Sequence, residues 1–264
     1  MIHNIIRDKA TKLFILLGGF FIANAIIAEV IGVKIFSLEA SLGVAQLHLP
    51  LFGSDFSFNL TTGVLLWPVV FIMTDIINEY YGTKGVKFLS YLTAGLISYA
   101  FVMFFVAIQL TPADWWVGSK QSTGVPNMQH AYSAIFGQGL WIIIGSLVAF
   151  LIGQMLDVLV FHKIKKVTGE KAIWARSTGS TLISQLIDSF VVLGIAFYIG
   201  PMIDPSNGAP WSLQQLMTVG VGNYIYKFVV AVVMTPVIYA VHGIIEKYLG
   251  AELSKSMKES AMQR

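Results

Sequence analysis

The sequence predicts an all-α, multi-pass membrane protein with six transmembrane helices. Of its 264 residues, 56% are hydrophobic and only 12% are charged, whereas a soluble domain has about 25% charged residues. The apolar residues gather in long stretches, and the basic residues gather in alternate loops. These observations exclude a disordered chain, a nucleic-acid-binding surface and an ordinary soluble enzyme.

Six apolar stretches follow one another along the chain. Each has about the 20 residues that a helix needs to cross a ~30 Å hydrocarbon core at 1.5 Å per residue. They cover residues 13–33, 63–81, 88–110, 140–161, 178–199 and 216–240. Pro68 and Pro236 fall inside two of them and predict helix kinks, because proline removes a backbone hydrogen bond.

The basic residues predict the orientation of these helices. Fourteen of the 17 lysines and arginines lie before the first stretch, after the last, or in the loops that follow the second and fourth. Positive charge favours the cytoplasmic side. Both termini are therefore expected in the cytoplasm, which requires an even number of crossings.

The loops and the tail complete the expected organisation. Residues 37–60 predict a small hairpin or interfacial flap, and residues 127–137 a short surface helix. Residues 1–249 would form one transmembrane domain, and the polar residues 250–264 a disordered cytoplasmic tail. The chain has no cysteine and only scattered histidines, so no metal, cofactor or enzyme activity is expected.

Charged residues inside the apolar stretches point to function. Each costs about 2.5–3.5 kcal/mol at the bilayer centre, and such residues by default mark a ligand or ion pathway. Asp188 and Lys227 lie near the midplane and could form an ion pair. The alternative for the acids nearer the helix ends is a structural role as solvated termini or as partners of nearby lysines. The six charged positions are Glu29, Asp75, Glu79, Asp157, Asp188 and Lys227.

Helical spacing places further polar residues beside these charges. On the fifth stretch, Ser180, Ser184 and Asp188 share a stripe with Ser177 and Thr181, and Gln185 lies next to it. Helix packing by small polar residues explains Ser180 and Ser184 equally well. Asn223 and Lys227 share a face of the sixth stretch, Gln154 and Asp157 are neighbours on the fourth, and Asn24 adds an amide to the first. Together these groups predict a central pocket whose amides and carboxylates could read the donor-rich edge of a purine-like base.

Three motifs resemble those of the queuosine precursor transporter family, formerly grouped as vitamin uptake transporters. They are F-I-M-T-D-I-I-N-E-Y-Y-G at residues 71–82, A-N-A at residues 23–25 leading to Lys34, and R-S-T-G-S at residues 176–180 leading to Gln185 and Asp188. The resemblance covers roughly residues 13–245. It implies inner-membrane import of 7-deazaguanines, such as 7-cyano-7-deazaguanine and 7-aminomethyl-7-deazaguanine, for salvage in tRNA modification. It also implies a fold related to the substrate-binding subunits of energy-coupling-factor transporters.

The polar residues inside the apolar stretches and the family resemblance together predict the site. Substrate would contact Asn24, Ser180, Ser184, Gln185, Asp188, Asn223 and Lys227. A second set would organise the gate or serve structure: Glu29, Asp75, Asn78, Glu79, Gln154, Asp157 and Arg176, the last paired with one of the acids. The expected partners are a deazapurine and the lipid bilayer, and no nucleic acid is expected. Assembly as a homodimer stays open.

Two other functions stay open at this stage. One is a vitamin-binding subunit that needs a separate ATPase module. The other is an intramembrane hydrolase that uses Asp75, Glu79 and Asp157, although the sequence offers no paired histidines and no nucleophile–base pair.

Overall fold

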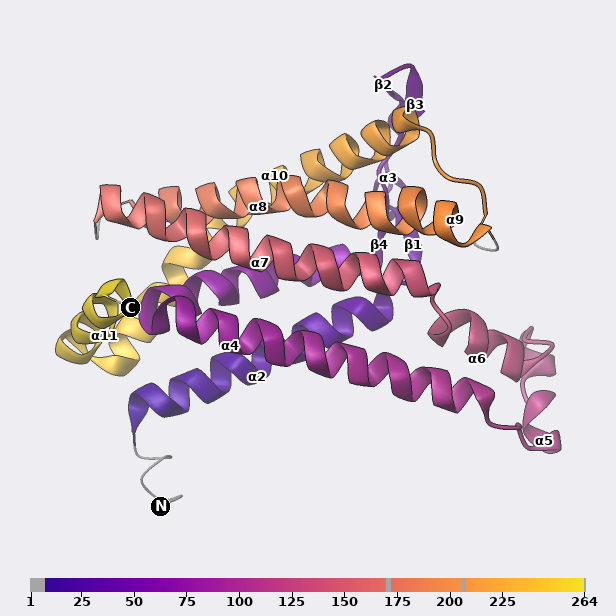
Figure 1. Cartoon of the computed structure of the whole chain (residues 1–264), viewed down its shortest axis with the longest axis horizontal. Helices are drawn as coiled ribbons and strands as arrows, with labels where there is room; N and C mark the ends of the chain where they lie inside the picture. Colours follow the sequence, from indigo (N-terminus) through magenta and orange to yellow (C-terminus); the bar gives the residue numbers. More distant parts are fainter. Residues whose placement is uncertain (1–7, 170–171, 206–207, 264) are drawn as a thin grey trace.

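The computed structural model describes residues 8–169, 172–205 and 208–263 and shows an elongated bundle of long helices (Figure 1). Among the described residues, five helices are long and apolar enough to cross a membrane. Many of their outward side chains are large and apolar, as contact with lipid requires, and Phe105 and Val233 are each 65% exposed. The five are α2 (Lys9–Ile31), α4 (Trp67–Gln109), α7 (Leu140–Thr168), α8 (Ile173–Leu193) and α10 (Leu213–Leu249).

Helix α4 is broken at Gly82 and folds back on itself. Gly82 has φ 71° and ψ −174°, which is not helical. A Cβ built on Gly85 would lie 3.5 Å from the side chain of Ile77, although eight residues of a straight helix span about 12 Å. The two apolar stretches predicted at residues 63–81 and 88–110 therefore correspond to the two arms of one hairpin, which Figure 1 shows side by side.

Short strands close one end of the bundle. β1 (Ile35–Ser37) pairs antiparallel with β4 (Asn59–Thr61), and β2 (Leu49–Leu51) pairs with β3 (Ser54–Phe56). This confirms the predicted hairpin in residues 37–60. Phe56 of β3 packs on Gly222 of α10, where a Cβ would lie only 2.0 Å from its ring, so a glycine is needed for the close approach.

The remaining elements are short. The predicted surface helix in residues 127–137 is confirmed as α6 (Met128–Phe136). The others are α3 (Leu38–Ser41), η1 (Thr62–Leu65), α5 (Asp114–Val117), η2 (Gln121–Thr123), the π-helical turn η3 (Gly194–Ile199) and α9 (Gly200–Ile203).

Pro68 lies in the first turn of α4, so the kink predicted there is wrong. The second apolar stretch begins at residue 63, whereas helix α4 begins at Trp67. In the first turn no intrahelical hydrogen bond is lost to proline. Pro236 does lie inside α10.

The predicted disorder of the tail is also wrong, because residues Ala251–Gln263 form helix α11. Its buried residues Ser254, Lys258 and Ala261 recur at helical spacing. The polar average composition of the tail does not reveal this buried stripe. The helix packs across the break in α4, and the Nζ of Lys258 lies 2.5 Å from the Oε1 of Glu246.

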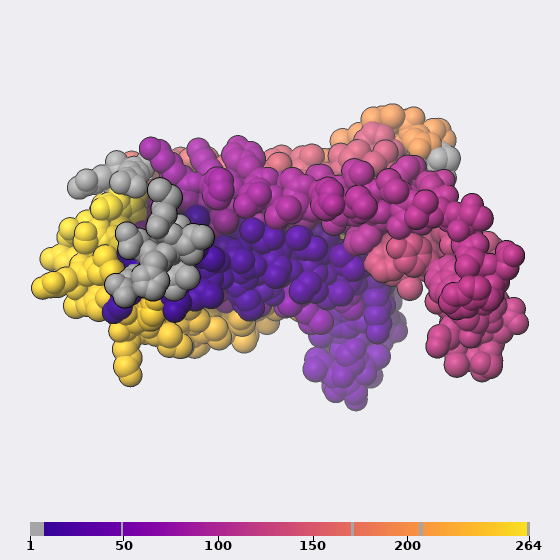
Figure 2. Space-filling model, turned by 90° about the horizontal axis from the view of Figure 1, so that it is seen from below, coloured from indigo at the N-terminus to yellow at the C-terminus, as the bar shows by residue number. Residues whose placement is uncertain are grey.

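The beginning of α2 and helix α11 lie at the same end of the bundle (Figure 1). Figure 2 shows α11 at this end, while the strands and the α5–α6 segment project near the other end. Asp8 caps α2 by accepting hydrogen bonds from the hydroxyl and backbone N–H of Thr11, which hold the pKa of its carboxyl below the ordinary value.

Gly82→Ala should destabilise the protein by about 1–3 kcal/mol, because its backbone conformation is open essentially to glycine alone. The new Cβ would also lie 3.0 Å from the carbonyl oxygen of Ala261. The measurement is the thermal unfolding midpoint in detergent. Gly95→Ala is the matched control, since a Cβ at this exposed helical position meets nothing within 4 Å; equal midpoints for the two variants would contradict the prediction.

Candidate functional site

The polar residues of α8 divide into two faces. At about 100° per residue, Ser177, Ser180 and Ser184 point one way, and Thr178, Thr181 and Gln185 point another. The serines contact carboxylates of α4 and α7, whereas the second group lines a pocket. From the sequence, Thr181 is expected to share one stripe with the serines, with Gln185 beside it; the structure instead places Thr181 and Gln185 on the pocket face.

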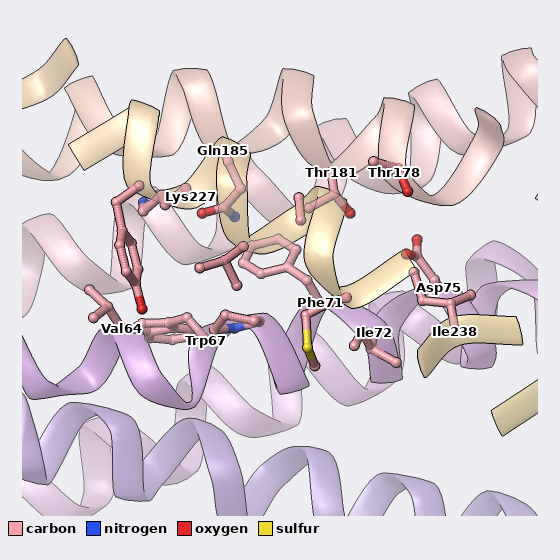
Figure 3. A pocket seen from close by; sticks show the side chains of 15 residues that line it. Val64, Trp67, Phe71, Ile72, Asp75, Thr178, Thr181, Gln185, Lys227 and Ile238 are labelled. Atoms are coloured by element: carbon pink, nitrogen blue, oxygen red, sulfur yellow. The ribbon is translucent and has the colours of Figure 1, made fainter. Parts of the chain in front are cut away.

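The pocket lies between α4, α8 and α10. Figure 3 shows Lys227, Gln185, Thr181 and Thr178 along one side, with Trp67 and Phe71 opposite and Asp75 at one end. Its empty space is about 510 Å³ including the open mouth. The other lining residues are Val64, Pro68, Ile72, Tyr226, Val230, Ala231, Met234 and Ile238.

Gln185 carries the strongest sign of a ligand. Its side chain is 4% exposed, and its Nε2 has no hydrogen-bond partner within the described parts of the chain. A buried donor without a partner costs about 1–3 kcal/mol. Figure 3 shows this amide directed into the pocket, so a bound molecule with an acceptor group would remove the cost.

Lys227 reaches the same pocket and is held by Asp188. Its Nζ lies 2.5 Å from the Oδ2 of Asp188, and both side chains are mostly buried. The predicted ion pair is confirmed. It leaves this side of the pocket polar but without net charge.

A second polar group lies at the end of the pocket. Asp75 is 1% exposed and its Oδ2 accepts a hydrogen bond from Ser177. Asp157 of α7 is fully buried, and its Oδ1 accepts from Ser184 at 3.3 Å and from Thr181 at 3.4 Å. The two carboxyls are near enough to interact electrostatically with each other.

Glu79 anchors a buried ion cluster one turn further along α4. Its Oε1 and Oε2 accept from the guanidinium of Arg176 at 2.9 and 3.1 Å, and its Oε2 lies 3.0 Å from the Nζ of Lys165. All three side chains are 1% exposed. Arg176 also donates to the carbonyl of Gly169 at 2.9 Å. The cluster joins α4 to α7 and α8, and the predicted pairing of Arg176 with an acid is confirmed.

The neighbours of Glu79 contact still other elements, so residues 71–82 form a structural hub. Thr74 donates to Gln154 of α7 at 2.8 Å, and the Oδ1 of Asn78 lies 2.8 Å from the Nε2 of His162. The remaining contacts extend the hub: Tyr80 lies 3.3 Å from His242 of α10, Tyr81 donates to the carbonyl of Ala10 at 2.7 Å, and Gly82 lies against Ala261 of α11.

Several expected site residues lie elsewhere. Asn24 donates to the carbonyl of Phe20 in its own helix at 2.8 Å. Glu29 accepts a hydrogen bond from Ser146, and Asn223 does not line the pocket. Ser180 and Ser184 support Asp157 instead. Of the seven residues expected to contact substrate, the pocket is lined by Gln185 and Lys227, with Asp188 behind Lys227.

The pocket residues that were not predicted include Phe71, Thr178 and Tyr226. Thr178 could have been found, because it precedes Thr181 and Gln185 by three and seven residues on the same helical face. An apolar residue such as Phe71 gives no comparable signal in an apolar helix.

Comparison with known proteins places this arrangement in a family. A family model described as "Putative vitamin uptake transporter" matches residues 61–241, which include the hub and the pocket. The chain belongs to that family. No solved structure matches it.

Curated relatives in this family have transporter names. A protein of Bacillus subtilis, named "Probable queuosine precursor transporter", is 30% identical over 70% of this chain and 72% of its own length. One of Haemophilus influenzae with the same name is 26% identical over 71% of this chain and 70% of its own length. The "Queuosine precursor transporter" of Escherichia coli is 25% identical over 86% of this chain and 89% of its own length. These names support a transport role for the family, and the long apolar helices fit a multi-pass membrane protein.

Arg176→Gln should destabilise the protein by about 3–5 kcal/mol, because it leaves the buried charge of Glu79 poorly compensated. The measurement is the thermal unfolding midpoint of purified protein in detergent. Lys163→Gln is the control, since it removes one positive charge from an exposed position nearby on α7. Similar midpoints for both variants would mean that the ion cluster contributes little to the fold.

Proposed function

We propose that this protein imports queuosine precursors across the bacterial inner membrane for salvage in tRNA modification. The substrates would be 7-deazaguanines such as 7-cyano-7-deazaguanine and 7-aminomethyl-7-deazaguanine. The names of the three relatives support this substrate class. The observation that carries the site is the buried, unpartnered Nε2 of Gln185.

The proposed topology has six crossings with both termini in the cytoplasm. The two arms of α4 would supply two crossings, and α2, α7, α8 and α10 the other four. The grouping of fourteen basic residues in alternate segments supports this orientation. A fold related to energy-coupling-factor subunits stays a prediction that rests on the family resemblance. Assembly as a homodimer stays a prediction that rests on the behaviour of membrane carriers in general.

The chemistry of a 7-deazaguanine suits the pocket. Its flat ring carries a carbonyl acceptor next to an N–H donor. A glutamine amide can meet such an edge with two hydrogen bonds, Nε2 donating to the carbonyl and Oε1 accepting from the N–H. Trp67 and Phe71 offer apolar surface to the ring faces, and the paired charges of Lys227 and Asp188 suit a ring without net charge.

The hub would form the cytoplasmic gate in this mechanism. Asp75 connects the pocket to the buried polar groups around Asn78, Glu79 and Arg176. Alternating access would require those groups to separate, with the break at Gly82 and the proline at position 236 as the places where helices change direction.

Gln185→Leu should raise the half-saturating concentration for uptake about 5- to 150-fold, because a bidentate hydrogen-bonded pair is worth about 1–3 kcal/mol. The measurement is uptake of labelled 7-cyano-7-deazaguanine by cells that lack their own importer. Gln109→Leu, at the exposed end of α4, should leave uptake unchanged.

Two results would argue against the proposed function. Inhibition of uptake by vitamins, but not by unlabelled deazaguanines, would mean that the substrate class is wrong. Uptake that needs a copurifying ATPase would favour the vitamin-transporter subunit instead.

A further inference from the structure

Two buried carboxyls, one at the end of the pocket and one on α7 behind it, lie without a neutralising cation among the described residues. Asp75 and Asp157 are nearly or fully buried, and no lysine, arginine or histidine forms an ion pair with either one within the described ranges. Among the described residues, the side chains that donate hydrogen bonds to them are hydroxyl groups of α8. Two adjacent buried carboxylates without a cation would repel each other strongly.

The unsatisfied oxygens show how this repulsion is relieved. Ser177 donates to Oδ2 of Asp75, and Ser184 and Thr181 donate to Oδ1 of Asp157. The oxygens left over are Oδ1 of Asp75 and Oδ2 of Asp157, which are buried and have no partner in the described chain. The two carboxyls are near enough to interact electrostatically, so one proton held by the pair would remove the repulsion between two negative charges.

Cations on the surrounding elements have other partners. Lys165 and Arg176 contact Glu79, and Lys227 contacts Asp188. None of these contacts neutralises the carboxyl pair. Besides tyrosines (Tyr80 and Tyr81 on α4; Tyr224, Tyr226 and Tyr248 on α10), the buried or partly buried charged and titratable groups on the surrounding helices are Glu79 on α4, His162 and Lys165 on α7, Arg176 and Asp188 on α8, and Lys227 and His242 on α10.

The position of the pair links it to the ligand site. Asp75 lines the pocket and Asp157 does not. The unpartnered amide of Gln185 opens into the same pocket, independently of the two acids. Because Asp75 is on α4 and Asp157 is on α7, a proton gained or lost by this pair would alter the contact between the two helices beside the ligand pocket.

We propose that the Asp75–Asp157 pair holds one proton and that this proton crosses the membrane with each substrate molecule, so that the protein is a proton-coupled importer. This inference rests on the proposed function. In each cycle a proton leaves water on the outer side and forms an O–H bond with a carboxylate of the pair. That bond breaks when the proton passes to cytoplasmic water, and nothing is oxidised or reduced. Without the proton, two negative charges push α4 and α7 apart, so the helices close around the substrate only when the pair is protonated.

The test uses the purified full chain in lipid vesicles, with labelled 7-cyano-7-deazaguanine as the probe. The outside is one pH unit more acidic than the inside, and the membrane potential is held at zero. The expected result for one proton per substrate is accumulation to about tenfold above the external concentration, because one pH unit corresponds to a tenfold ratio. A protonophore should abolish this accumulation.

Asp157→Asn separates coupling from transport. Its amide N–H can donate permanently where the shared proton lies, so the variant should still exchange internal for external substrate but should no longer accumulate it. Asp114→Asn is the matched control, because Asp114 is an exposed carboxylate of α5, and it should accumulate substrate like the unmodified protein.

Other outcomes give distinct answers. If the unmodified protein exchanges substrate but never exceeds the external concentration, the proposed function stands and proton coupling is wrong. If it exchanges no deazaguanine, the proposed function fails and the coupling fails with it. If Asp157→Asn does not fold, a pH dye inside vesicles of the unmodified protein decides the question: substrate added outside should acidify the lumen, and an unchanged lumen overturns the proposal.

Discussion

The buried charge of Glu79 is the constraint on which the packing of α4 against α7 and α8 depends. An ionised carboxylate in an apolar interior costs several kcal/mol unless its partners are close and well oriented. Here the guanidinium of Arg176 meets both oxygens, and Lys165 meets one of them. Satisfying this one group therefore fixes the rotation of three helices. The contacts of Thr74, Asn78 and Tyr80 then follow, because those residues lie on the same two turns of α4.

The fixed rotation of α8 explains how one helix serves two purposes. With Arg176 bound to Glu79, the serines at 177, 180 and 184 necessarily face the carboxyls of α4 and α7. Thr178, Thr181 and Gln185, about 100° away, then face α10 across the pocket. The ion cluster thus determines which polar residues are used for support and which are available to a ligand.

Much of the helical layout could be predicted from the sequence, because hydropathy and loop charge depend only on order along the chain. The roles of the polar residues could not be predicted in the same way. Asp157 and Gln185 look equivalent in an apolar helix, yet one is held by hydroxyl groups and the other has an unpartnered amide. Helix α11 was hidden for a related reason: its buried stripe depends on a partner surface at Gly82, and its average composition is that of a solvated tail.

Several of the unsatisfied buried polar atoms lie between α4 and α7. In most folded proteins nearly all buried polar groups have partners. Here the described chain leaves the Nδ2 of Asn78 and the Nε2 of Gln154 without partners, although each amide already binds another helix through its oxygen. These atoms lie at the contact of α4 with α7, beside the Asp75–Asp157 pair. A rigid interface would gain stability by satisfying them, whereas an interface that must separate and rejoin benefits from contacts that are incomplete in each state. In the proposed transport cycle, the carboxyl pair and the two half-satisfied amides therefore favour the contact between α4 and α7 as the part of the bundle that would change.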